Sequence, residues 1–194
     1  MKRLVFVSGM ICSCLLAGNL FDYDQWAKDL QTMIELNQNS SQTIAGSDIN
    51  KNMVRDDVEN YIKQKYKDDE FQKIMFLEAA KKIQQILTLP KNADKKIHIR
   101  LDRELLQVYT CRDYILYKHN DVDIEKELEQ KAEFKSKVLN TRARLQAYIE
   151  HKKMVPFKYS IPSDKELYEQ KNECEKLYSK IKSESKKTTV LSIN

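Results

Sequence analysis

The sequence predicts an all-α fold, an antiparallel bundle of about five to six helices with one long helix and one disulfide. One observation is the scarcity of turn formers, because the 194 residues contain only three glycines and three prolines. Sandwiches, barrels and Rossmann folds need many residues with positive φ, which so few glycines cannot supply. A further observation is that apolar residues recur at helical spacing along most of the chain.

Residues 1–18 are predicted to be a signal peptide. Residues 1–3 are Met-Lys-Arg, and residues 4–17 carry no charge. An apolar run of this length is too short to span a bilayer and is typical of the central part of an export signal. Cleavage after this run would leave a single helical domain of residues 19–183 and a flexible tail of residues 184–194. The protein is therefore expected to be periplasmic or secreted.

A second processing route stays open at residues 11–14. Their sequence, Ile-Cys-Ser-Cys, resembles a bacterial lipobox, in which Cys14 would carry the lipid. The protein would then be a membrane-anchored envelope lipoprotein. No later stretch approaches eighteen consecutive apolar residues, so the lipid is the only membrane attachment that the sequence suggests.

The N-terminal half predicts three helices. An apolar stripe that includes Trp26 and Leu30 predicts the first helix over residues 25–37. Asp48 is the predicted cap of the second helix. The inward side chains of that helix would be Met53, Val54, Val58, Tyr61 and Ile62. Asp69 and Gln72 have capping-box spacing at the start of a third helix, which Pro90 ends.

The C-terminal half predicts three more helices. The first begins at residue 96 or 102 and ends at about residue 118. The second is the long helix, which begins at Asp121 or Asp123, continues to about Lys153 and would extend about 45 Å at 1.5 Å per residue. Ser163 and Glu166 form a capping box that opens the last helix.

Two cysteines, Cys111 and Cys174, remain after removal of the leader. Each lies on the apolar stripe of a predicted helix, and an oxidising compartment favours their pairing. A disulfide between them would join the helix that ends near residue 118 to the last helix. The alternative is a pair of buried free thiols.

The sequence predicts no enzyme, no cofactor and no metal site. It contains no H-E-x-x-H, no C-x-x-C and no G-x-S-x-G motif. The three histidines, His98, His119 and His151, are far apart and lack metal-ligand spacing. Each is expected at the surface or at a helix end.

The charge pattern argues against a nucleic-acid partner and leaves room for a protein partner. Residues 19–60 hold three basic and eight acidic side chains, a net charge of −5, whereas residues 61–194 carry +8. The basic residues alternate with Asp and Glu instead of forming a patch. Tyrosine and arginine are the side chains that often anchor protein interfaces. The candidate partner-binding residues are Tyr109, Tyr114, Tyr117, Arg142, Arg144 and Tyr148. The tyrosines would also suit the rim of a helical core.

The stretch Leu101–Tyr109 resembles part of small secreted helical lysozyme-inhibitor-like domains. The several paired cysteines of those domains are missing here, so the stretch assigns no family. The expected function is that of an exported, non-enzymatic protein-binding module, such as an inhibitor or immunity protein against a secreted toxin or wall-degrading enzyme. The alternatives are an envelope lipoprotein with a structural or adaptor role and a helical carrier of a small hydrophobic ligand. The carrier would need a cavity lined by Phe71, Met75 and Ile83. Partner identity and oligomeric state stay open.

Overall fold

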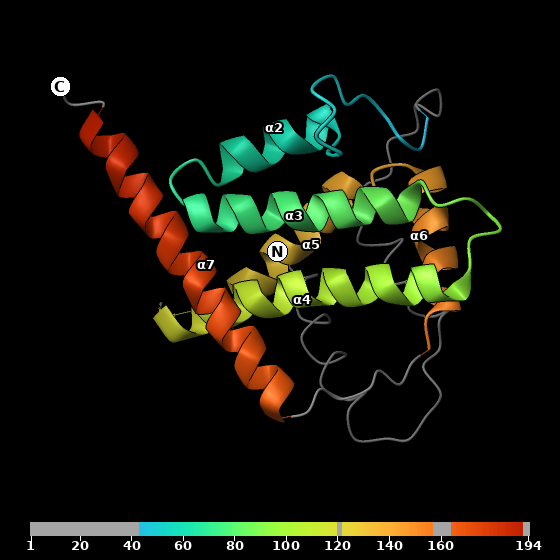
Figure 1. Ribbon diagram of the computed structural model, residues 1–194. Helices are drawn as coiled ribbons and strands as arrows, with labels where there is room; N and C mark the ends of the chain where they lie inside the picture. The colour runs from blue at the N-terminus through green and yellow to red at the C-terminus, as the bar shows by residue number, and fades with distance from the viewer. Residues whose placement is uncertain (1–42, 120–121, 157–163, 192–194) are drawn as a thin grey trace, which may run out of the picture.

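The computed structural model describes residues 43–119, 122–156 and 164–191, and within these ranges it is helical, without strands (Figure 1). Its helices are α2 (Asp56–Lys65), α3 (Glu70–Leu87), α4 (Lys95–His119), α5 (Ile124–Val138), α6 (Arg142–Met154) and α7 (Asp164–Leu191). The predicted signal peptide, the candidate lipidation site Cys14, the helix over residues 25–37 and the Ser163 cap lie outside the described residues.

The antiparallel pair of α3 and α4 forms the centre of the bundle (Figure 1). Helix α2 packs on α3, α6 packs on both central helices, and α7 crosses the two obliquely at the end where α4 finishes (Figure 1). The predicted all-α antiparallel bundle is confirmed. In the described part of the chain, no helix is both long enough and apolar enough to cross a membrane.

Two groups of buried side chains form the core. The larger group joins α2, α3, α4, α5 and α6. Its members include Ile62, Phe76, Ile83, Leu105, Phe134 and Ile149. The smaller group lies where α7 meets α3 and α4. Its members are Phe71, Met75, Cys111, Ile115 and Ile181. The three residues proposed to line a carrier cavity are therefore divided between two packed clusters.

The start of α2 differs from the prediction. The helix begins at Asp56, and the Asp48 carboxylate accepts from the backbone N–H groups of Asn52 and Met53 instead of capping it. The backbone at Lys51 and Met53 has φ of 56° and 67°, values that no right-handed helix contains. Asp48 thus stabilises a turn, and Met53, predicted to point inward, is 50% exposed.

The boundaries of α3 and α4 follow the predicted signals. The Asp69 carboxylate accepts from the Gln72 backbone N–H at 2.9 Å, which is the predicted N-cap. Helix α3 ends at Leu87, before Pro90. Helix α4 begins at Lys95, close to the earlier of its two predicted starts.

The predicted long helix to Lys153 is wrong, because the chain breaks between α5 and α6. Arg55 donates to the carbonyl oxygens of Lys137 and Val138, which are acceptors that a helix end leaves unpaired. The Thr141 hydroxyl then accepts from the Arg144 backbone N–H and caps α6. In the described part of the chain the longest helices are instead α4 and α7, and α7 continues to Leu191, into the segment expected to be a flexible tail.

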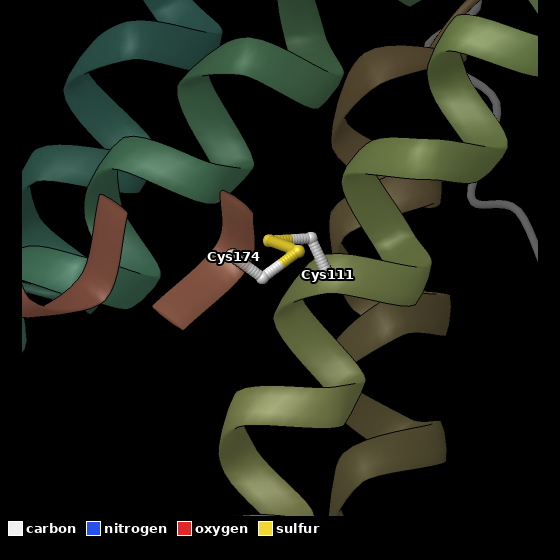
Figure 2. The surroundings of a disulfide bond; sticks show 2 residues. All are labelled: Cys111 and Cys174. Atoms are coloured by element: carbon white, nitrogen blue, oxygen red, sulfur yellow. A yellow bond between two sulfur atoms is a disulfide. The ribbon is translucent and has the colours of Figure 1, made fainter. Parts of the chain in front are cut away.

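The predicted disulfide joins Cys111 on α4 to Cys174 on α7 (Figure 2). The two Cα atoms lie 5.5 Å apart, within the usual range for a disulfide. The bond belongs to the smaller core cluster, where Phe71 and Tyr178 also meet edge to face at 5.1 Å. It therefore fastens α7 to the bundle within their apolar contact.

Candidate functional site

A buried group of ionisable side chains lies between α4 and α6, and we call it the histidine cluster. His98 and Asp102 are one turn apart on α4, and their neighbours Leu101 and Leu105 face the core. His151 and Lys152 extend from the C-terminal half of α6. The four residues meet because the inward faces of the two helices pack against each other.

The geometry of the cluster is a short chain of hydrogen bonds. His98 Nδ1 lies 2.9 Å from His151 Nδ1. On the other side of its ring, His151 Nε2 lies 3.3 Å from Asp102 Oδ1. The Lys152 ammonium donates to the same oxygen at 2.6 Å. His98, Asp102 and His151 are only 8%, 3% and 1% exposed, so the chain of bonds is shielded from water.

The direction of each hydrogen bond follows from the carboxylate. An ionised Asp102 can only accept, so His151 must carry its proton on Nε2. The neutral His151 ring then has a bare Nδ1, which accepts from the Nδ1–H of His98. Two neutral rings therefore satisfy the chain with a single arrangement of protons.

The surroundings of the histidine cluster shift the pKa values of several of its ionisable side chains. Burial would raise the pKa of Asp102, but the hydrogen bond from His151 and the charge of Lys152 outweigh it and keep that pKa below its usual value. Burial, together with the nearby His151, lowers the pKa of His98. On α5, burial lowers the pKa of Lys135 to about 8, and the charge of Lys152 adds to this effect.

The arrangement is suited to holding and exchanging a proton. A carboxylate that orients an imidazole is also the arrangement of a general base, but the second nitrogen of His151 is occupied by His98. Within the described ranges, no group of three or more His, Cys, Asp or Glu side chains is placed to hold a metal ion. A shallow groove elsewhere on α4 is lined by Lys96, Ile99, Arg100, Arg103, Glu104 and Gln107, and none of these belongs to the cluster.

Of the two expected positions for the histidines, surface or helix end, His98 and His151 take the second: His98 lies in the first turn of α4 and His151 in the last turn of α6, and both are buried. The expectation is also confirmed for His119, the last residue of α4. The signal in the sequence that could have indicated the cluster was the one-turn spacing of His98 and Asp102 on the apolar face of α4. Their partner His151 is 53 residues from His98, and only the packing of the two helices reveals it.

The structure separates the predicted partner-binding residues. Arg144 and Tyr148 are 0% and 3% exposed, and the Tyr109 hydroxyl is buried. Tyr114 is half-buried beside the ammonium groups of two lysines. Tyr117 and Arg142 are exposed, but they lie at opposite ends of the bundle, at the end of α4 and the start of α6 (Figure 1).

Arg144 has an internal role. Its guanidinium donates to the carbonyl oxygens of Thr43 and Ile44 and to the Asn140 side chain. Burial and the neighbouring Arg55 lower the pKa of Arg144 to about 10. The residue therefore ties the segment before α2 to the start of α6.

Comparison of the chain with protein-family models, curated proteins and solved structures gave no match.

Proposed function

We propose that the protein is exported and acts by binding another protein. The disulfide between α4 and α7 supports export, because structural disulfides persist in oxidising compartments. The basic start and uncharged apolar run of residues 1–17 support the same conclusion. A bound partner such as a secreted toxin or wall-degrading enzyme would make this an inhibitor or immunity protein.

The observation that carries the binding proposal is the exposure of three apolar side chains on either side of the junction of α4 and α5. We call them the α4–α5 patch, which consists of Tyr117, Ile124 and Leu128. Their side chains are 54%, 60% and 41% exposed. Single exposed apolar residues are common on soluble proteins, but grouped ones favour an interaction site.

Two ion pairs join α4 to α5 near these side chains, Arg112 with Glu127 and Asp113 with Lys131. The Lys131 ammonium donates to Asp113 at 2.6 Å and fixes the register of the two helices. Tyr117 lies one turn beyond Asp113 on α4, and Ile124 and Leu128 lie in the two turns of α5 that precede Lys131. The proposed occupant is a protein surface with apolar side chains, for which Tyr117 would provide an aromatic anchor.

The test is affinity capture with the mature protein from extracts of its native host. The double variant Tyr117→Ala/Leu128→Ala removes most of the patch. Ile49→Ala is the matched control, because Ile49 is 84% exposed and is tied to the first turn of α2 through Asp56. We expect one protein to be captured in stoichiometric amount by the wild type and the control and to be lost with the double variant. Recovery of no such protein, or equal capture by all three forms, would contradict the proposal.

An envelope lipoprotein is the second candidate, and the lipobox-like residues 11–14 favour it. The intact mass of the native protein separates the two candidates. A chain that starts at residue 18 or 19 supports the soluble exported module. A chain that starts at an acylated Cys14 supports the lipoprotein, and an uncleaved chain with reactive thiols would contradict both.

A further inference from the structure

The hydrogen bond between His98 and His151 is sensitive to protonation. It forms when one Nδ1 carries a proton and the facing Nδ1 does not. A first added proton can bind His98 at Nε2, and the bond to His151 survives. A second added proton must bind His151 at Nδ1, where two N–H groups would face each other 2.9 Å apart.

We propose that the His98–His151 pair is an acid-sensitive latch, which holds α6 against α4 while at least one ring is neutral and releases it when both rings are charged. The two histidines come from different helices, and each is at least nine-tenths buried. The repulsion between two imidazolium rings would therefore act across the contact of the two helices. Water cannot screen this repulsion without separating them.

The charged groups around the pair do not compensate for a second positive charge. Asp102 on α4 is the anion of the cluster, and it already accepts from both His151 and Lys152. Helix α5 contributes another cation, Lys135, whose field also reaches Asp102 and Lys152.

Two further neighbours in the described part of the chain are a neutral phenol and an apolar surface. Tyr148 on α6 contacts the His151 ring, and burial raises the pKa of its hydroxyl, so it stays neutral. Helix α3, which packs on both α4 and α6, contributes apolar side chains such as Ile83, Ile86 and Leu87 to their shared core.

The sign of the pH effect follows from proton counting. Burial lowers the pKa of His98, and the neighbouring His151 lowers it further. As the pH falls below about 6.5, the folded state therefore binds fewer protons than the unfolded state. Protonation of His98 is therefore disfavoured in the folded state, and the contact of α4 and α6 should be fully stable above that pH and weaken as the pH falls to the range in which both rings carry a second proton. The weakening is about tenfold in the opening equilibrium for each unit by which the folded pKa lies below the unfolded value.

Hydrogen exchange on the full mature chain, with its disulfide intact, tests the latch. Protection factors, which correct for the intrinsic pH dependence of exchange, are compared at about pH 7.5 and 5 for wild type, His98→Gln and the control His119→Gln. We expect α6 to lose protection about tenfold or more relative to α2 in the wild type and the control. The loss should be absent in His98→Gln, whose amide cannot gain a charge. Equal protection at both pH values, or the same loss in all three proteins, would overturn the proposal.

A second measurement needs no variant and remains available if His98→Gln does not fold. The chain has only three histidines, so nitrogen NMR of the rings separates His98, His119 and His151. At neutral pH we expect the Nδ1–H form of His98 and the Nε2–H form of His151, with the pKa of His98 below the ordinary histidine value. The opposite forms, or a pKa of His98 at or above the ordinary histidine value, would refute the shared-proton arrangement.

Discussion

Replacing Arg112 by methionine should destabilise the protein more than removing a surface charge does. The Arg112 side chain is 1% exposed and lies over the Phe76 ring at 4.6 Å. It donates twice to the Gln72 side-chain oxygen, at 3.0 and 2.6 Å, and also binds Glu127. Methionine keeps much of the volume but leaves the Glu127 carboxylate and the Gln72 oxygen without these donors.

The size of the effect follows from the burial of these groups. Removing one partner of a buried ion pair costs about 3–5 kcal/mol, because the other charge stays buried and unpaired. That is a large part of the roughly 5–15 kcal/mol by which a domain of this size is stable. The matched control is Lys65→Met, which breaks the Lys65–Glu133 pair, whose side chains are 39% and 40% exposed. Such a pair contributes about 0–1 kcal/mol.

Urea unfolding at pH 7 with the disulfide intact measures both variants. The double variant Arg112→Met/Glu127→Gln should recover part of the loss, since the unpaired carboxylate is removed. A cost below about 1 kcal/mol for Arg112→Met, or one equal to that of Lys65→Met, would refute the reasoning. The comparison is valid only if the slope of the unfolding free energy against urea concentration is the same in all variants.

Three further predictions concern backbone, cross-link and acid stability. Gly46→Ala should cost about 2–4 kcal/mol in urea unfolding, because φ is +70° and a Cβ atom would lie 2.2 Å from Arg55 Cδ; a cost under 0.5 kcal/mol would contradict this. Replacing both Cys111 and Cys174 by alanine should cost about 4 kcal/mol, the loop-closure term for a sequence separation of 63, in the same assay, and an unchanged midpoint would contradict it. Asp102→Asn should cost about 2–3 kcal/mol at pH 7, because the carboxylate accepts two hydrogen bonds from positively charged or ionisable donors in a buried site. The pKa of Asp102 is lowered in the folded state, so its contribution to stability is present above about pH 4 and is lost as the pH falls through the folded value. Thermal melting should therefore show a smaller fall in stability between pH 7 and pH 3 for the variant than for the wild type. Equal losses would refute that assignment.

Local signals in the sequence were sufficient for the boundaries of α3 and α4. Asp69 caps α3 through a bond to a residue three positions away, and Pro90 stops the following turn, so both effects are visible within a short window. The break between α5 and α6 is different, because Arg55, which binds the end of α5, is 83 residues from Val138. A pattern of apolar residues cannot show such a long-range bond, and it therefore favours a continuous helix.

The candidate site depended on long-range packing even more strongly. Burial of His98 follows from its place on the apolar face of α4, but its role depends on which side chain faces it from α6. The partner-binding candidates show the same limit. Tyr117 and Tyr148 are the same residue type on neighbouring helices, yet one is 54% exposed and the other 3%. Composition shows which side chains could bind a partner. Which of them are exposed depends on how the helices are rotated relative to one another.

The position of the disulfide also affects how newly made chains mature. The smaller core cluster forms the apolar contact of α7 with the bundle. Cys111 belongs to this cluster, and its disulfide partner Cys174 packs against it. Before oxidation, α7 is held by that contact and by polar contacts such as the Lys118–Glu175 ion pair, and its detachment would uncover Phe71, Met75 and Ile115 on α3 and α4. These side chains would promote self-association of reduced chains. Oxidation thus protects the protein from aggregation during maturation, in addition to stabilising its final fold.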